Sequence, residues 1–192
     1  GVIVEEWRMR DLNAGGRIFT TDFMYTWYRD TTDAALKSAL SITGGAPGRS
    51  SPVALNTSFP KGQALADYLK HVFPKSVPVQ SAKVPFDSVY GNIASLDPSK
   101  SQSWAAENVT LETKFPRIFT VNAPAGVAAE KQCGKGVHID AHVNSIDKVN
   151  SAYPLSCSSP LNEGEATLAF FFFDLASCIQ DDSKPLITPP TN

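Results

Sequence analysis

Two histidines and one aspartate alternate with apolar residues in the segment from Gly134 to Val143. His138, Asp140 and His142 occupy every second position there, and the alternation predicts a β-strand. Successive side chains of a strand point to opposite faces, so we expect these three on one face. Two imidazoles and a carboxylate on one face can bind a divalent cation such as zinc or calcium, or move a proton. In a covered sheet they would be costly to bury without such a partner.

A further carboxylate follows another predicted strand. Residues 17–21 are β-branched and aromatic, and Asp22 comes directly after them. Open α/β sheets bind ligands at the carboxyl ends of their strands. If the two strands are neighbours, Asp22 therefore meets Asp140 and His142.

Three interpretations of this cluster stay open. In the first, His142 and Asp140 form a buried hydrogen-bonded pair that fixes the loops after the strands. In the second, both bind a divalent metal together with Asp22, and His138 is a further candidate ligand. In the third, His142 is a catalytic general base that a carboxylate such as Asp140 orients. These segments place no serine or cysteine on a strand–turn–helix elbow, so a nucleophile would be water or would come from elsewhere.

The composition excludes several classes of partner. The 192 residues are 42% hydrophobic and 19% charged, with a net charge of −2, which is typical of a globular protein and provides no basic face. The longest apolar run, residues 166–176, contains Asp174 and is too short to cross a bilayer. We therefore expect no nucleic-acid partner and no membrane span. We expect a single α/β domain over residues 1–182 and a proline-rich tail at 183–192.

Helical and strand patterns alternate along the chain. A helix at 3–13, then Gly15-Gly16, then the strand at 17–21 form the αβ step of a layered α/β domain. The clearest helical pattern begins at an Asn162 cap with Glu165 three residues later. The other expected features are a helix from Thr31 or Thr32 to Leu40, strands at 53–56, 84–90, 117–121 and 136–140, a helix at 64–73, a loop at 97–103 and an anchoring Trp104.

Two other groups of residues allow a functional or a packing interpretation. Tyr25, Trp27 and Tyr28 make a dense aromatic patch that can stack on sugars, so carbohydrate is a candidate partner. Such a patch is more typical of side chains that pack a loop, and we favour that interpretation. His71 lies away from the apolar side of its helix and is expected on the surface.

The odd number of cysteines bears on the compartment of the protein. We expect Cys157 to pair with Cys178, because the first precedes the last helix and the second closes it; Cys133 with Cys157 is the alternative. Cys133 would then bind another segment or chain of the same precursor. The start at Gly1 without methionine indicates a processed fragment. Two glycosylation sequons and the serine- and proline-rich loops favour a secreted protein, while three reduced thiols in a cytosolic protein remain the alternative.

Four segments of the chain resemble one group of bacterial proteins. They are Asn13–Asp22, Asn56–Gly62, Cys133–His142 and Glu165–Cys178. The sequence resembles extracellular or cell-envelope proteins, mostly uncharacterised, whose domain is similar to class I glutamine amidotransferases and ThuA-like proteins. The resemblance implies a three-layer, flavodoxin-like and hence Rossmann-like sheet with helices on both faces. It also implies further strands upstream of Gly1, one of them ending near a cysteine, which this chain would lack.

Some candidate site residues match those of the related proteins and others do not. Relatives have an aspartate and a histidine that match Asp140 and His142, but an aromatic residue where this chain has His138. They tend to have a His-aromatic-His run where residues 22–24 of this chain are Asp-Phe-Met, and class I amidotransferases use a cysteine, histidine and glutamate set that this chain does not show.

These comparisons favour a non-enzymatic extracellular or cell-surface module with a degenerate amidotransferase-like fold, serving structure or binding; a periplasmic location is also compatible. The alternative is a metal-dependent or His-assisted hydrolase with its site at Asp22, Asp140 and His142. The sequence leaves open whether the protein is an enzyme.

Overall fold

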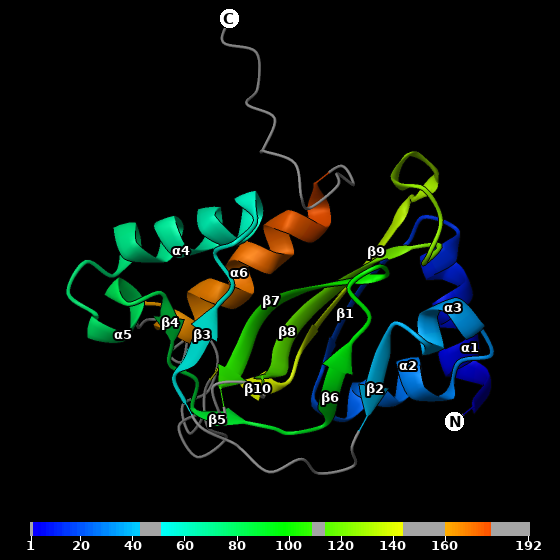
Figure 1. Ribbon diagram of the computed structural model, residues 1–192, viewed down its shortest axis with the longest axis horizontal. Coiled ribbons are helices and arrows are strands. Elements are labelled where there is room, and N and C mark those ends of the chain that lie inside the picture. Colours follow the sequence, from blue (N-terminus) through cyan, green and yellow to red (C-terminus); the bar gives the residue numbers. More distant parts are fainter. Residues whose placement is uncertain (1, 43–50, 109–113, 144–159, 178–192) are drawn as a thin grey trace, which may run out of the picture.

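The computed structural model describes residues 2–42, 51–108, 114–143 and 160–177. Within them a curled six-stranded sheet has the order β1 (Arg17–Thr21), β9 (Gly134–Ile139), β8 (Lys114–Ala123), β7 (Ser101–Asn108), β3 (Val53–Leu55) and β4 (Lys83–Val84) (Figure 1). β1 and β9 run parallel, whereas the other neighbouring strands are antiparallel. The sheet is therefore mixed.

Two helices cover one face of this sheet (Figure 1). α4 (Pro60–Val72) is amphipathic and begins with a proline, whose missing N–H is not needed in the first helical turn. α6 (Glu163–Ala176) begins at the predicted capping box: the Asn162 side chain accepts a hydrogen bond from the Glu165 N–H, and the Glu165 carboxylate accepts one from the Asn162 N–H. The short α5 (Val77–Gln80) packs against α4.

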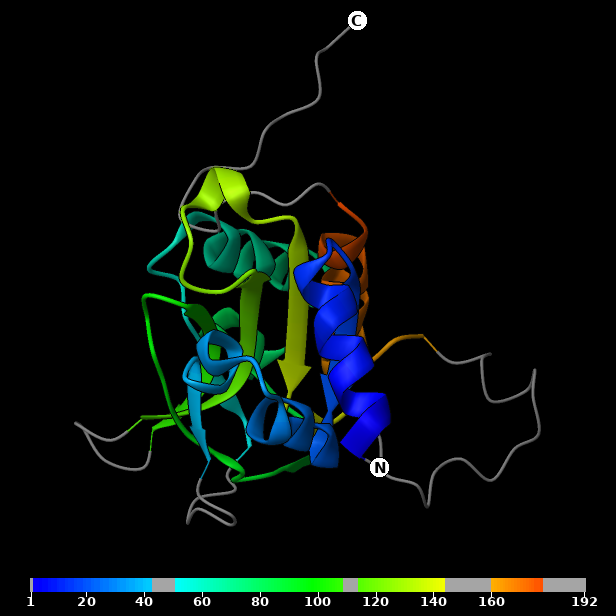
Figure 2. The ribbon, with the colours of Figure 1, turned by 90° about the vertical axis from the view of Figure 1, so that its right-hand side faces the viewer.

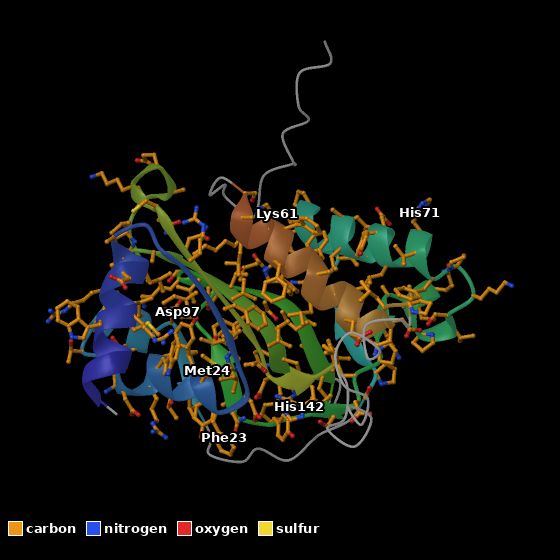
Figure 3. All side chains as sticks on the ribbon, turned by 180° about the vertical axis from the view of Figure 1, so that it is seen from behind. Phe23, Met24, Lys61, His71, Asp97 and His142 are labelled. Carbon is orange, nitrogen blue, oxygen red and sulfur yellow. The ribbon has the colours of Figure 1, made fainter. Side chains whose placement is uncertain are left out.

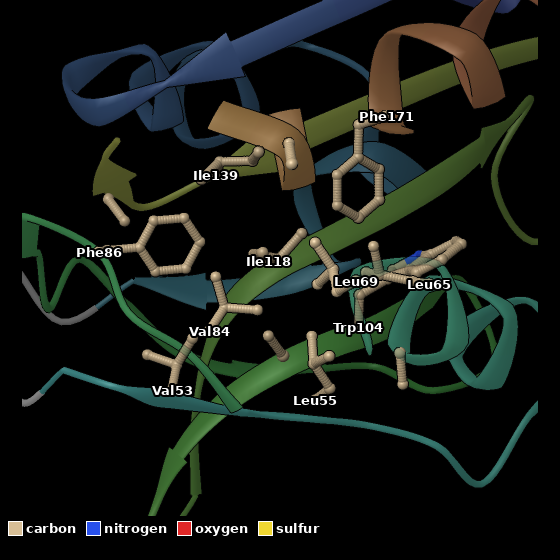
Figure 4. Close-up of a cluster of buried hydrophobic side chains, with 14 of the residues drawn as sticks. Val53, Leu55, Leu65, Leu69, Val84, Phe86, Trp104, Ile118, Ile139 and Phe171 are labelled. Carbon is tan, nitrogen blue, oxygen red and sulfur yellow. The ribbon is translucent and has the colours of Figure 1, made fainter. Parts of the chain in front are cut away.

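Trp104, which the sequence predicts to anchor its segment, lies in the core under these helices. Its side chain is fully buried and packs against the rings of Phe59 and Phe171, and its indole N–H donates to Thr120 Oγ1 at 2.9 Å. Figure 4 shows Leu65 and Leu69 of α4 beside this tryptophan, and Ile118 and Ile139 of the sheet belong to the same buried cluster.

The opposite face is covered on the β1 side of the sheet. α1 (Val2–Asn13), η1 (Asp22–Tyr25), α2 (Thr26–Asp30) and α3 (Ala34–Lys37) lie there, and Figure 2 shows α1 along this side. Gly134 allows α1 to approach, because a Cβ atom on it would lie 1.7 Å from the carbonyl oxygen of Leu12. With helices on both faces of the sheet, the predicted α/β layering is confirmed. The core of this second layer contains no residue of β7, β3 or β4 among those described.

Two short ladders lie outside the main sheet. β2 (Leu40–Ile42) pairs with β6 (Ile93–Leu96), and β5 (Ser88–Val89) pairs with β10 (Ala141–His142). η2 (Ala129–Lys131) lies in the connection between β8 and β9. The second ladder matters for the candidate site, because the chain leaves β9 after Ile139 and joins β5 instead.

Three elements differ in extent from the sequence prediction. The helix expected from Thr31 or Thr32 to Leu40 is the single turn α3, which is capped by Asp33. The strand expected at 84–90 is divided into β4 and β5. Residues 101–103, expected in a loop, begin β7, because pairing with β8 outweighs the weak strand preference of serine.

Several predictions concern residues outside the described ranges. Cys157, Cys178 and the tail at 183–192 lie there, so the disulfide pairing, the domain boundary and the tail stay predictions. Cys133 is exposed, which leaves its expected partner in the precursor untested. In the described part of the chain, no helix combines the length and the apolar character needed to cross a membrane.

Candidate functional site

Asp22 and His142 meet at the carboxyl ends of the parallel strands β1 and β9, as the sequence predicts. Asp22 Oδ2 lies 2.9 Å from Nε2 of His142, and both side chains are about one-third exposed. Asp22 turns the chain from β1 into η1 with a φ of 55°, a left-handed conformation that aspartate tolerates better than most residues. On the other side of the imidazole, Nδ1 lies 3.2 Å from the Tyr90 hydroxyl. His142 therefore bridges the turn after β1 and the loop after β5.

Asp140 and His138 form a second, buried group beside this bridge. The Asp140 carboxylate accepts hydrogen bonds from the backbone N–H and the side-chain amide of Asn92, at 2.9 and 2.8 Å. Its Oδ1 lies 3.9 Å from His138 Nε2, while His138 Nδ1 lies 3.0 Å from Thr20 Oγ1. Burial acts to raise the pKa of Asp140, but His138 and the Asn92 hydrogen bonds outweigh it, so this pKa lies below its ordinary value.

The predicted four-residue cluster is thus divided into two pairs. Side-chain alternation along one strand ends at Ile139, since Ala141 and His142 belong to β10. Tyr90 and Asn92 complete the two pairs, and the sequence pattern did not indicate either of them. Their only signal is their place at the end of the predicted strand at 84–90 and just beyond it, where a residue can reach a neighbouring strand end.

The arrangement around His142 is suited to proton transfer. A carboxylate and a phenol hydrogen-bond the two ring nitrogens, which suits proton transfer between them. A small apolar pocket of about 250 Å³ adjoins the imidazole, with walls from Phe19, Ile139 and Leu168. A reacting group in this pocket would lie near the imidazole.

A metal ion at this edge would need several of these atoms to converge. Asp22 and His142 are hydrogen-bonded to each other, and the Asp140 carboxylate is held by Asn92. Across the described ranges, no three or more His, Cys, Asp or Glu side chains are arranged to hold a metal ion. The metal site at Asp22, His138, Asp140 and His142 stays a prediction, and it would require the mutual bond of Asp22 and His142 to open.

The aromatic patch and His71, the other candidates from the sequence, lie outside this site. Tyr25 and Tyr28 are buried in the second core, and Trp27 packs against the guanidinium of Arg8 at 4.7 Å from its ring centroid. The aromatic patch therefore packs its loop, as favoured above, and carbohydrate binding by the patch stays a prediction. His71 is exposed on α4, as expected.

A second ionisable cluster lies at the amino end of β9. Lys61 from α4 donates to Asp174 Oδ1 at 2.9 Å, and Lys135 from β9 contacts the other oxygen of the same carboxylate. Burial acts to raise the pKa of Asp174, but the two ammonium groups outweigh it and hold this pKa below its ordinary value. Figure 3 shows Lys61 and His142 at opposite ends of the sheet. This cluster joins both helices of the first layer to β9.

A hollow that could hold a ligand lies over β7, with a volume of about 760 Å³. β7 lies between β3 and β8 in the sheet (Figure 1), and residues in or near β3 and β6 form the walls of the hollow. The lining includes both polar and apolar side chains. The polar ones are those of Thr57, Ser58, Ser95, Ser101, Gln102 and Ser103, and the apolar ones include those of Ala54, Leu96, Pro98, Ala106 and Pro116. No ionisable side chain lines this β7 groove within the described ranges. Its volume is in the range of known ligand sites, about 300–1,000 Å³.

Local hydrogen bonds order both walls of the β7 groove. On one wall, the Asn56 side chain accepts from Ser58 N and Oγ, at 3.1 and 2.6 Å, and donates to the Ser103 carbonyl at 2.9 Å. On the other wall, Asp97 accepts from Ser99 and from Lys100, the latter at 2.5 Å. These bonds lower the pKa of Asp97 to about 2, with Lys100 as the largest cause. The walls are therefore formed before any ligand arrives.

Comparison with known proteins adds no assignment to this geometry. No protein-family model matches the chain, and neither the curated proteins nor the solved structures provide a match.

Proposed function

We propose that this chain is a non-enzymatic binding module of an extracellular or cell-surface protein, in which a degenerate flavodoxin-like, amidotransferase-like scaffold carries a binding surface. The parallel β1–β9 pair would be the part of the sheet that keeps the arrangement of such folds. The proposed location draws on the resemblance stated above and on the loop composition.

One observation carries the proposal: the preformed β7 groove is open, while the ionisable side chains at the strand ends are bonded to one another. His142 holds Asp22 and Tyr90, and Asp140 holds Asn92. Groups engaged in this way connect loops. The β7 groove instead offers a volume of about 760 Å³, and ligands bind in preformed concave sites of this size.

The test compares binding with turnover on the same purified chain. Neutral and acidic oligosaccharides, peptides and nucleotides are titrated by calorimetry, and chromogenic esters, amides, phosphates and glycosides are assayed. We expect saturable binding that Ser95→Trp weakens at least about tenfold and His142→Ala leaves intact. Turnover that His142→Ala removes would contradict the proposal.

A second candidate function is a His-assisted hydrolase, which the Asp22–His142–Tyr90 bridge favours. In this function His142 accepts a proton from water and Asp22 orients the imidazole. The adjoining apolar pocket of about 250 Å³ would hold the acyl part of a substrate. A metal-dependent form would further require zinc or a similar ion at Asp22 and His142.

Metal analysis and ester hydrolysis decide between the two functions. One equivalent of zinc in the purified protein, lost in His142→Ala, would establish the metal-dependent form. Hydrolysis that needs Asp22 and His142 but no added metal would establish the other form. Neither activity is expected from a binding module.

A further inference from the structure

The β7 groove carries groups that are available to a ligand. In the described chain, the hydroxyls of Thr57, Ser95 and Ser103 make no hydrogen bond with the protein. The side-chain amide nitrogen of Gln102 donates to the Ser103 carbonyl at 2.9 Å, which leaves its carbonyl oxygen as an acceptor. Hydroxyls donate and accept, so this set can match a ligand that does both.

Charge selects the class of ligand that fits. The lining holds hydroxyl, amide and apolar side chains, in a protein with 36 formally charged side chains, 17 basic and 19 acidic. The carboxylate of Asp97, between the lining residues Leu96 and Pro98, is bonded to the ammonium group of Lys100. A charged ligand would lose hydration in the groove without gaining an opposite charge, whereas a neutral ligand pays no such penalty.

The apolar part of the lining narrows the class further. Leu96, Pro98 and Pro116 stand among the hydroxyls. A sugar ring presents C–H groups on its faces and hydroxyls around its edge, so it can contact both kinds of surface at once. An extended peptide would need main-chain partners on β7. One side of β7 is paired with β8 along its length, and on the other side β3 pairs at Ala105 and Ala106. The Ser103 carbonyl in the groove already accepts hydrogen bonds from the side chains of Asn56 and Gln102.

We propose that the β7 groove binds a segment of a neutral glycan, through the hydroxyls of Thr57, Ser95 and Ser103 and the amide of Gln102. This inference rests on the proposed function of a binding module and names its ligand. The ordered walls reduce the entropy that binding costs, because the loops at Asn56 and Asp97 are held in place beforehand.

The first experiment measures glycan binding by the full chain. An array of neutral glycans of hexoses, N-acetylhexosamines, deoxyhexoses and pentoses is probed, with uronate and sialylated glycans as the charged arm, and hits are titrated by calorimetry. We expect saturable binding of neutral glycans alone. Absence of any neutral ligand on the array would overturn the inference.

Two variants test whether the groove is the binding site. Ser95 is exposed on the wall, so Ser95→Trp fills the groove without touching the core, and we expect it to weaken binding at least about tenfold. Val77→Trp is the matched control, at a position on α5 that is 78% exposed and outside the groove, and it should leave affinity unchanged. Equal affinity of Ser95→Trp and the native chain would overturn the inference.

An isosteric variant gives a finer test. Thr57→Val removes one hydroxyl that bonds to no described residue, so folding should be unaffected and glycan affinity should fall about two- to tenfold. An unchanged affinity would remove Thr57 from the site and contradict the assigned contact.

The outcomes separate this inference from the function on which it rests. If a peptide or an acidic glycan binds and Ser95→Trp abolishes that binding, the neutral-glycan inference fails while the binding module stands. If the β7 groove binds nothing and His142-dependent turnover is found, both fail.

Discussion

β9 and β7 are both inner strands of one sheet, yet the surfaces built on them differ in charge. The segment from Lys135 to His142 carries ionisable groups at both ends of β9, and they bond to Asp174, Asn92 and Asp22. The open face of β7 carries serine, glutamine and alanine instead. The difference indicates that the charges around β9 connect layers and loops, whereas the surface on β7 is neutral. Four predictions test the comparison, beginning with the largest expected effect.

Asp174 should matter most for stability. Asp174→Ala removes the carboxylate that Lys61 and Lys135 share. The site is buried, because both lysine side chains are 2% exposed and that of Asp174 is 7% exposed. Breaking a buried ion pair by removing one partner costs about 3–5 kcal/mol. We expect a loss of that size in the free energy of unfolding, measured by denaturant titration.

The matched control is Asp67→Ala on the exposed side of α4, which should change stability by less than about 0.5 kcal/mol. The pKa of Asp174 is lowered in the folded protein, so its contribution is present above the ordinary value of 3.8 and is lost as pH falls through the lower folded value. The native and variant stabilities should therefore converge in acid. A gap that stays constant with pH would show that the carboxylate acts through packing alone.

Asp140 should have the next largest effect. Asp140→Asn keeps the shape of the side chain but removes the charge that faces His138 and the second oxygen acceptor for Asn92. Hydrogen bonds to charged groups contribute about 1.5–3 kcal/mol, and we expect a loss of that size in the free energy of unfolding. If the variant instead keeps its stability and loses bound metal, Asp140 is a ligand and the structural interpretation is wrong.

His142 should contribute less. The side chains of His142 and Asp22 are 31% and 28% exposed, so solvent screens their interaction, and His142→Ala should cost less than about 1 kcal/mol. Thermal unfolding measures this cost, and glycan titration of the same variant should match the native chain. A loss of binding in His142→Ala would move the site from the β7 groove to the strand ends.

The smallest expected effect is that of pH on glycan affinity. The groove lining described here holds no titratable side chain, and the wall residue Asp97 has a pKa of about 2. Affinity should therefore be constant between about pH 5 and pH 8, the window in which histidine changes its charge. Calorimetric titrations across this window provide the measurement. A transition near the ordinary histidine pKa would show that one of the three histidines, His71, His138 or His142, takes part in binding.

The sequence allowed one half of this comparison to be predicted. Asp22 and His142 each follow a strand with clear alternation, and the parallel pairing of β1 and β9 places them together. The capping box of α6 and the burial of Trp104 were predicted for equally local reasons. Local patterns of this kind indicate where a strand or helix ends.

The β7 groove could not be predicted in the same way. Its walls come from segments near Asn56 and Asp97, about 40 positions apart, and its floor begins with serines that favoured a loop. Tyr90 and Asn92 were missed because they follow a segment without periodicity. Local sequence patterns do not indicate a surface that forms only when distant segments pack together. An uncharged surface also lacks the clusters of charged residues that can mark a binding site in a sequence.

The most direct test of the central claim is a map of backbone amide chemical shifts in labelled protein during titration with neutral hexasaccharides of glucose and of N-acetylglucosamine. The account predicts that shifts concentrate at Thr57, Ser95, Gln102 and Ser103 and leave Asp22, Tyr90 and His142 unchanged. Shifts centred on Asp22 and His142, with the β7 groove silent, would contradict it.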